Sequence, residues 1–297
     1  MTQSLSQRLQ QDAVMVEALN ENAGHYLTKG TLIDSGETPF QSYEVWDTPQ
    51  FGKLFRLDGY FMTSEKDEFI YHENLIHLPC MAMSAPKRAL VIGGGDGGSA
   101  DELFKYPSMD EVVLVELDGK VIDIAREHLQ CVHNGSLDDP RLTLRIEDGL
   151  HYVRVVAPEE GGKFDLVVLD LTDPIGPAEA LYTEAFLTEC KSLMTEQGAI
   201  TLHLGAPVFQ AERVRELIRR LRSVFNHVRP HFHYIPLYGS LWGMACASDT
   251  TDPAERTRED IVRRLAERGI DQRQYYNEDT HQAAFMYPNF LRELISE

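Results

Sequence analysis

Four carboxylates follow directly after apolar segments of the sequence, and this placement is the first indication of a binding or catalytic site. The acids are Asp96, Glu116, Asp148 and Asp170. In a parallel sheet the carboxyl ends of the strands meet at one edge, and ligands bind there. A lone acid is usually a solvated loop residue. Four acids at matching positions instead predict a shared acidic site.

The loop Gly93–Gly98 reads GGGDGG and follows a buried apolar segment. It contains the pattern G-x-G-x-x-G, in which glycines such as Gly93 and Gly95 let the backbone approach a nucleotide and a helix N-terminus supplies donors. Dinucleotide enzymes and sulfonium-nucleoside enzymes share this pattern. Asp96 inside the loop would repel a pyrophosphate and attract a sulfonium or an alkylammonium. The loop therefore favours a cationic nucleoside over NAD.

The other strand-end acids fit the parts of such a nucleoside. Glu116 can accept hydrogen bonds from both ribose hydroxyls. Asp148 can accept one from an adenine amino group, with Gly149 leaving room for the ring.

Asp170 and Asp173 flank a turn stiffened by prolines and are expected close to Asp96. Carboxylates so close would raise each other's pKa unless a cation lay among them. A diamine supplies that cation at one end and a nucleophilic amine at the other, and Asp170 can take the proton that this amine loses. Tyr71 and His72 could orient the same nitrogen.

The surrounding periodicity predicts the elements that position these residues. Alternating residues over 24–64 predict short antiparallel strands, with a hairpin turn at Asp58-Gly59. A helix is expected over 65–84. Strands at 88–94, 111–118, 141–148, 164–171 and 198–205 alternate with helices, among them 181–194 and 208–225, and an antiparallel pair closes the sheet. The predicted fold is α/β: a small N-terminal antiparallel β-domain (1–66) and a Rossmann-like, doubly wound sheet domain of class I methyltransferase type (67–297).

Composition narrows the function further. The chain has 297 residues and a formal net charge of −19, which argues against nucleic-acid binding and is compatible with a cationic substrate. Its four cysteines show no metal or disulfide pattern, so we predict no metal site. No apolar run is long enough for a membrane span or a signal peptide, which predicts a cytoplasmic protein without membrane partners.

The sequence resembles the spermidine synthase (polyamine aminopropyltransferase) family over nearly its whole length. The resemblance rests on DEFIYHENLIHLP (67–79), VIGGGDGG (91–98), VELD (115–118), IEDG (146–149), DLTDPIGPAEALY (170–182), IPLYGSLWG (235–243) and the tail 274–294. It implies an aminopropyltransferase that uses decarboxylated S-adenosylmethionine as co-substrate, with no tightly bound cofactor. Putrescine is the usual acceptor, spermidine and methylthioadenosine are the products, and the enzyme is a homodimer or homotetramer.

The resemblance also implies roles for individual residues. Asp170 is the proton acceptor, assisted by Tyr71. Contacts to the amine are expected from Tyr71, His72, Asp96, Asp170, Asp173 and Tyr238, and contacts to the nucleoside from Gln41, Glu116, Asp148, Gly149 and Pro177. Three positions near the expected cleft depart from the family pattern and bear on the acceptor: Asp101, Leu171 and His203.

Three other functions stay open at this point. The sheet also suits a methyltransferase that uses intact S-adenosylmethionine, although the loop offers no Arg or Lys for that molecule's carboxylate. The departures would suit a non-catalytic protein that binds polyamines or nucleosides. An NAD dehydrogenase fits least, because of Asp96.

Overall fold

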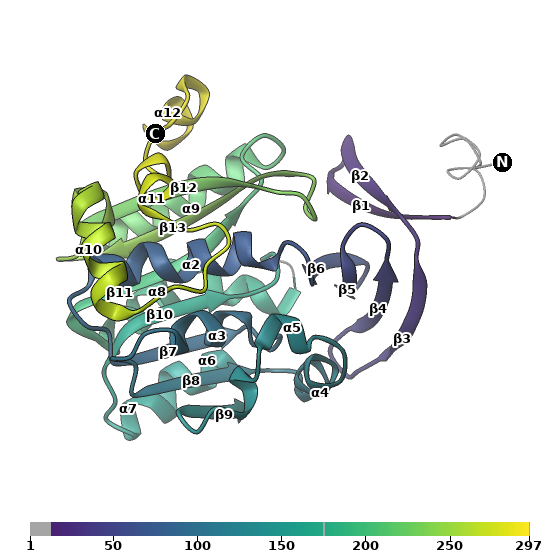
Figure 1. Cartoon of the computed structure of the whole chain (residues 1–297), viewed down its shortest axis with the longest axis horizontal. Helices are drawn as coiled ribbons and strands as arrows, with labels where there is room; N and C mark the ends of the chain where they lie inside the picture. Colours follow the sequence, from purple (N-terminus) through teal and green to yellow (C-terminus); the bar gives the residue numbers. More distant parts are fainter. Residues whose placement is uncertain (1–12, 175, 297) are drawn as a thin grey trace.

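The computed structural model describes residues 13–174 and 176–296, and its largest element is a seven-stranded sheet (Figure 1). The strand order is β12-β13-β11-β10-β7-β8-β9. The strands are β7 (Arg88–Gly93), β8 (Glu111–Glu116), β9 (Leu142–Ile146), β10 (Phe164–Asp170), β11 (Met194–Gly205), β12 (His227–Ile235) and β13 (Ser240–Ser248). The first five are mutually parallel, while β13 and β12 add an antiparallel edge. This confirms the predicted Rossmann-like α/β fold.

The order of the strands fixes where a ligand can bind. From β7 the chain proceeds to β8 and β9 on one side and then crosses to β10 and β11 on the other. The carboxyl ends of β7 and β10 therefore flank the switch point, which is where open α/β sheets bind ligands.

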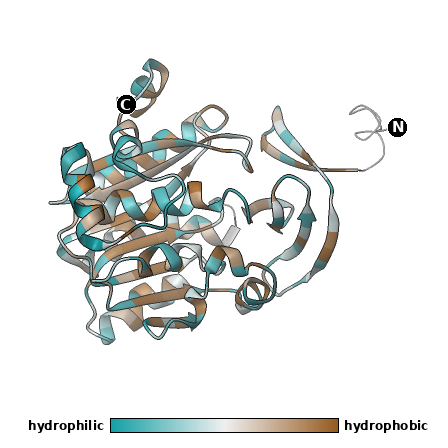
Figure 2. Cartoon of the chain, in the orientation of Figure 1, coloured by the Kyte–Doolittle hydropathy of each residue, from teal (hydrophilic) through white to brown (hydrophobic). Residues whose placement is uncertain are grey.

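Successive residues of the central strands pack into two different cores. Val91 and Val168 lie in one core with Leu75 of helix α2 (Glu68–Ala82), while Ile92 lies in the other with Leu217 of helix α9 (Ala211–Val224). Neighbouring side chains on a strand point to opposite faces, so strands covered on both sides are apolar throughout. Figure 2 shows the central strands as the most hydrophobic part of the chain.

The N-terminal part forms two smaller antiparallel sheets. A hairpin of β1 (Val14–Asn20) and β2 (Ala23–Thr28) stands beside a four-stranded sheet of β3 (Thr31–Glu37), β4 (Ser42–Thr48), β5 (Gly52–Leu57) and β6 (Tyr60–Ser64). Asp58 and Gly59 have φ values of 47° and 82°, as a type I′ hairpin turn requires, so that predicted turn is confirmed. Strand β1 was not predicted, since the expected strands began at residue 24.

The remaining helices surround the large sheet. They are α3 (Gly98–Phe104), α4 (Gly119–His128), α5 (Gln130–His133), α6 (Gly149–His151), α7 (Ala157–Glu159), α8 (Glu184–Ser192), α10 (Arg258–Arg268), α11 (Glu278–Ala283) and α12 (Asn289–Ser296). The single helix predicted over 181–194 is wrong at both ends. Residues Gly176–Tyr182 form a 3-10 helix, and Met194 already belongs to β11. Within residues 13–174 and 176–296, no helix is long and apolar enough to cross a membrane.

Candidate active site

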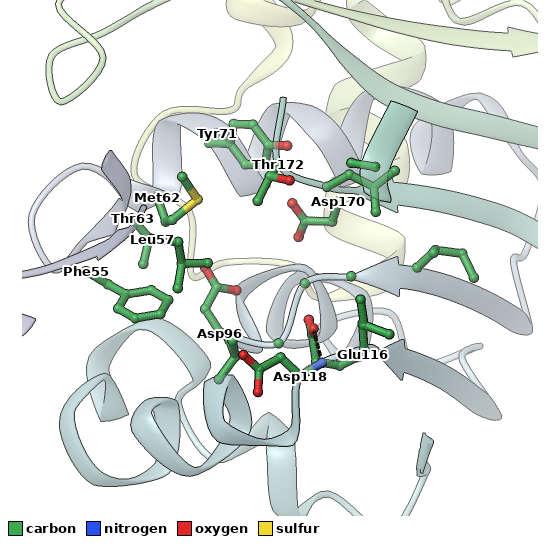
Figure 3. A pocket seen from close by; sticks show the side chains of 18 of the residues that line it. Phe55, Leu57, Met62, Thr63, Tyr71, Asp96, Glu116, Asp118, Asp170 and Thr172 are labelled. Carbon is green, nitrogen blue, oxygen red and sulfur yellow. Dashed lines mark hydrogen bonds between the residues drawn. The ribbon is translucent and has the colours of Figure 1, made fainter. Parts of the chain in front are cut away.

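A cavity of about 490 Å³ lies between the four-stranded sheet and the carboxyl ends of the parallel strands, and we call it the main cavity. Figure 3 shows Leu57 and Met62 of the N-terminal sheet on one side of it and Asp170 on the other. Its lining includes most of the residues predicted to bind substrate: Gln41, Tyr71, His72, Gly93, Gly95, Asp96, Glu116, Asp148, Gly149, Asp170 and Tyr238.

The glycine loop is shaped by close packing against protein groups. Gly93 has φ +79°, and a Cβ atom there would lie 2.2 Å from the carbonyl oxygen of Asp170. The next amide, of Gly94, donates a 2.8 Å hydrogen bond to that oxygen. A Cβ on Gly98 would lie 2.3 Å from the His72 ring. The glycines therefore bring together the end of β7, the end of β10 and the face of α2 that carries His72.

His72 is held among three carboxylates. Its Nδ1 lies 2.7 Å from Glu68 Oε2, and its Nε2 lies 3.7 Å from Asp96 and 3.9 Å from Asp170. Burial alone would lower the pKa of His72, but the charges of Asp96, Glu68 and Asp170 outweigh it and raise the pKa to about 10. His72 is therefore an imidazolium at neutral pH. The ligand atoms of His72, Asp96 and Asp170 lie within 4.8 Å of one another, and a metal ion bound there would have to displace the proton of the imidazolium.

Asp170 ends β10 and is nearly enclosed, with its side chain 11% exposed. Ser99 Oγ donates a 2.7 Å hydrogen bond to Asp170 Oδ2, and the Tyr71 hydroxyl lies near the same carboxylate. Burial raises the pKa of Asp170, and the charge of His72 opposes this rise. A carboxylate with a raised pKa is a better proton acceptor, which suits the predicted role.

The end of β8 supplies two acids to the main cavity, Glu116 and Asp118. Glu116 Oε1 accepts a 2.9 Å hydrogen bond from the backbone amide of Asp118, which is drawn in Figure 3. Burial raises the pKa of Glu116 to about 7, although this and other backbone hydrogen bonds lower it. A donor hydroxyl placed beside Glu116 would stabilise its charged form.

The wall of the main cavity that comes from the N-terminal sheet is hydrogen-bonded to Asp118. Gln41 Nε2 and Thr38 Oγ1 donate to Asp118 Oδ2 at 3.1 Å and 2.8 Å. Gln41 precedes β4, so these bonds join the N-terminal sheet to the end of β8. Asp118 also caps α4 through the amide of Lys120.

Asp148 follows β9 and caps the short helix α6 by accepting a 2.8 Å hydrogen bond from the amide of Leu150. A Cβ on Gly149 would lie 2.6 Å from Ile92, so this glycine leaves room for Ile92. Ile92, Leu150 and Leu181 line the cavity beside Asp148 and make this part apolar, as an adenine ring requires. Of the predicted nucleoside contacts, Pro177 lies in the 3-10 helix, and its side chain is outside the part that the structure describes.

A smaller cavity of about 110 Å³ adjoins the main cavity, and we call it the side cavity. The two share six lining residues: Leu57, Met62, Tyr71, Leu171, Thr172 and Tyr238. The rest of the side cavity is lined by Glu17, Tyr60, Phe61, Asp173, His203 and Trp242. The Tyr238 hydroxyl donates a 2.7 Å hydrogen bond to the carbonyl of Met62.

Asp173 was expected close to Asp96 and Asp170, but within the described residues it is absent from the lining of the main cavity, and its contact with the amine stays a prediction. Asp173 lines the side cavity. Its Oδ1 accepts a 2.8 Å hydrogen bond from Arg213 Nη2, and its Oδ2 forms an ion pair with Arg213 Nη1 at 2.7 Å. Burial raises the pKa of Asp173, but the bonds and charge of Arg213 outweigh it and lower the pKa below its usual value.

The three departures from the family pattern separate in space. Leu171 lines both cavities and His203 lines the side cavity. Asp101 was expected near the cleft, but it is absent from both linings within the described residues and lies 3.5 Å from Lys105. Its helix turns it away from the site, whereas Ser99 of the same helix reaches Asp170.

Four residues of this region escaped the sequence analysis. Glu68 could have been found, because it precedes His72 by one helical turn. Asp118 stands in the VELD segment, two residues after Glu116. Glu17 and Arg213 carry no local signal, because each meets its partners across a large separation in the sequence.

Comparison with known proteins agrees with this geometry. The family model described as "Spermine/spermidine synthase domain" matches residues 68–258. The polyamine aminopropyltransferase of Nitrosomonas europaea is 44% identical over 95% of this chain and 86% of its own length. The polyamine aminopropyltransferase 1 of Pseudomonas aeruginosa is 35% identical over 95% of this chain and 97% of its own.

Two solved structures share the fold over nearly the whole chain. A spermidine synthase in complex with the transition state analogue AdoDATO has a TM-score of 0.87 and 33% identity, covering 95% of this chain and 94% of that one. The spermidine synthase of Thermotoga maritima has a TM-score of 0.84 and 32% identity over the same shares. These matches confirm the resemblance found in the sequence: the chain belongs to the spermine/spermidine synthase family of transferases.

Proposed function

We propose that the protein transfers the aminopropyl group of decarboxylated S-adenosylmethionine to putrescine or a related diamine, giving spermidine and methylthioadenosine. The observation that carries this proposal is the position of Asp170. Its buried carboxylate lines the main cavity, within 3.9 Å of His72, and the next two residues, Leu171 and Thr172, line both cavities.

The main cavity also suits the decarboxylated donor better than the intact one. None of the described residues that line it is Lys or Arg, and Asp67, Glu68 and Asp96 are among them. Intact S-adenosylmethionine would bring a carboxylate into this acidic lining without a cationic partner other than His72. The donor without that carboxylate brings only cationic groups, which the lining favours.

We assign the nucleoside to the β8 and β9 side of the main cavity. Glu116 accepts from the ribose hydroxyls and Gln41 closes over them. Asp148 accepts from the adenine amino group beside Ile92, Leu150 and Leu181. The loop Gly93–Gly95 then lies against the sulfur end of the donor, and Asp96 stabilises its positive charge.

In the transfer step, the acceptor nitrogen attacks the propyl carbon bonded to sulfur. A carbon–nitrogen bond forms, the carbon–sulfur bond breaks, and its electron pair neutralises the sulfonium to give the thioether of methylthioadenosine. The nitrogen loses one proton to Asp170, which Tyr71 and Ser99 orient.

His72 and Tyr238 complete the amine site in this proposal. As an imidazolium, His72 does not act as the base. Its positive charge partly balances Asp96 and Asp170, so that the reacting amine is not held too firmly as an ammonium. Tyr71 and Tyr238 meet edge to face at 6.3 Å and form an aromatic wall along the alkyl chain of the acceptor.

The direct test is to incubate the purified protein with decarboxylated S-adenosylmethionine and putrescine and to measure methylthioadenosine and spermidine. Both products should form in equal amounts. The absence of product with every diamine and triamine tried would exclude the proposal. Calorimetry should show tighter binding of the decarboxylated donor than of intact S-adenosylmethionine, and the reverse order would favour a methyltransferase. The cytoplasmic location and the homodimer or homotetramer remain predictions.

A further inference from the structure

The side cavity holds two carboxylates, and only one of them has a cationic partner at hydrogen-bonding distance within the described residues. Asp173 is paired by the two-pronged contact with Arg213, whose side chain is 19% exposed. Glu17 is 7% exposed and accepts a 2.5 Å hydrogen bond from the uncharged backbone amide of Phe61. The nearby guanidinium of Arg56 is itself paired with Glu44 at 2.6 Å.

His203, which also lines the side cavity, adds no charge. The Tyr182 hydroxyl donates to the carbonyl of Thr172 at 2.9 Å, so it accepts from His203 Nε2, which lies 2.6 Å away. His203 Nδ1 is buried without a hydrogen-bond partner in the described structure, where a proton would be left unsatisfied. The ring is therefore neutral, and it stacks on Trp242 at 5.8 Å.

The backbone around Arg213 leaves space for its side chain next to Asp173. Arg213 lies in the first turn of α9, where the helix dipole disfavours a cation and Asp173 compensates for it. Gly205 has φ +93°, and a Cβ there would lie 2.4 Å from Gln210 and 3.2 Å from Arg213. Gln210 in turn donates to the carbonyl of Leu19, and Asn20 donates to the carbonyl of Phe209. The same loop thus anchors Arg213 and the strand that carries Glu17.

We propose that Arg213 is a specificity-determining residue, which limits the side cavity to one net negative charge and so selects acceptors that place a single ammonium there. This inference rests on the proposed aminopropyl transfer. Burial raises the pKa of Glu17 to about 7, and an ammonium bound beside it favours the charged form. With that ammonium in place, Glu17 and Asp173 contribute two negative charges and Arg213 one positive charge. A diamine with one end beside Asp170 leaves one ammonium for the side cavity. A triamine leaves two, and the second lacks a counter-charge.

The test compares putrescine with spermidine as acceptors in the wild-type enzyme and in Arg213→Met. Removing the guanidinium should lower the preference for putrescine, measured as the ratio of the two kcat/KM values, by about tenfold or more. At an effective dielectric constant of about 20, one charge at about 4 Å is worth more than the roughly 1.4 kcal/mol that a tenfold change represents. Arg213→Gln, which keeps donors for Asp173 but no charge, should shift the ratio in the same direction.

Two control variants distinguish an effect of the Arg213 charge from an effect on folding. Arg219→Met changes the same residue type on the same helix at a site 62% exposed, and should leave the ratio unchanged. The double variant Arg213→Met/Asp173→Asn restores one net negative charge, so its ratio should return to within about threefold of wild type. A folded Arg213→Met with the wild-type ratio, or a double variant that behaves like the single one, would overturn the proposal.

A binding measurement distinguishes this inference from the function on which it rests. The affinities of putrescine and spermidine for the enzyme–methylthioadenosine complex can be measured by calorimetry without turnover. If no amine is a substrate, the proposed transfer fails. The relative affinity for the two amines should still shift towards spermidine in Arg213→Met, and an unchanged relative affinity counts against Arg213 alone.

Discussion

At the scale of single residues, the proposed site separates a proton acceptor, Asp170, from a fixed cation, His72. Asp170 has a raised pKa because it is buried, and His72 has a pKa raised to about 10 because three carboxylates surround it. The two side chains are 3.9 Å apart, yet only Asp170 can take a proton at neutral pH. The histidine, which sequence reasoning tends to treat as a base, is here a counter-charge.

Asp170→Asn should reduce kcat by about a hundred- to ten-thousandfold, the range typical of losing a general base. The amide keeps the shape and can still accept from Ser99, so methylthioadenosine should bind about as well as in the wild type. Steady-state rates and calorimetry check the two parts. Full activity in this variant would remove Asp170 from the role of proton acceptor.

Glu116→Gln should make the unliganded protein more stable at pH 8 by about 1–3 kcal/mol. Burial raises the pKa of Glu116 from 4.5 to about 7, so the folded state binds more protons than the unfolded state between these values. The contribution of this group to stability is therefore lost as the pH rises from about 4.5 to about 7, and glutamine cannot ionise.

Urea unfolding at pH 4 and pH 8 checks this prediction. The difference between Glu116→Gln and wild type should vanish at pH 4, and an equal difference at both values would contradict the assigned cause. The same variant should bind methylthioadenosine more weakly, because the proposed acceptor for the ribose hydroxyls is changed. The carboxylate of Glu116 would then be kept for binding at a cost in the stability of the unliganded protein.

At the scale of elements, the glycine loop positions one helix against another. Sequence reasoning treated the loop as a cradle for a ligand, and it does line the main cavity. Its last glycine, however, is required by contact between α3 and the His72 side of α2. A pattern of glycines shows that something approaches closely, but it does not say whether the approaching group is a ligand or another helix.

Gly98→Ala should therefore lower kcat/KM by displacing His72 from Asp96 and Asp170, with a loss of about tenfold or more expected for misplaced catalytic groups. Gly119→Ala is the matched control, because Gly119 also begins a helix after a strand and a Cβ there meets Ile146 only at 3.3 Å. The values of kcat/KM and the thermal unfolding temperatures of both variants test this prediction. Equal effects of the two changes would contradict the special role of Gly98.

The elements also show which parts of the structure could be read from the sequence. The parallel strands and the acids at their ends were predictable, because apolar runs and the residues that follow them are local signals. The strand β1 was not predicted, although its buried and exposed residues alternate. The pair of Asp173 with Arg213 could not be predicted, because it depends on how α9 packs beside the end of β10 and not on any nearby residue.

At the scale of the whole molecule, the site is assembled from regions far apart in the chain. The N-terminal sheet, α2 and the strand ends each supply part of the main cavity, and the chain as a whole carries a net charge of −19. An acidic protein attracts cationic molecules over several ångströms, and this attraction weakens as salt shortens the Debye length.

The value of kcat/KM for putrescine should therefore fall as ionic strength rises from about 0.01 M to about 0.15 M, over which the Debye length shortens from about 30 Å to about 8 Å. Binding of methylthioadenosine, which is uncharged at neutral pH, should change little and serves as the control. A rate that does not depend on salt would show that the overall charge has no part in capturing the amine.

The hairpin β1–β2 is tied to the large sheet domain by contacts such as those of Asn20 with Phe209 and His25 with Leu237. It carries Glu17, while Asp170 stands at the end of a central strand. In the proposed acceptor site, the end of the amine that does not react thus faces a peripheral piece of the chain. Mutations in that piece can alter which amine is accepted and leave the reacting centre intact, which gives such an enzyme a route to evolve new polyamine products by small steps.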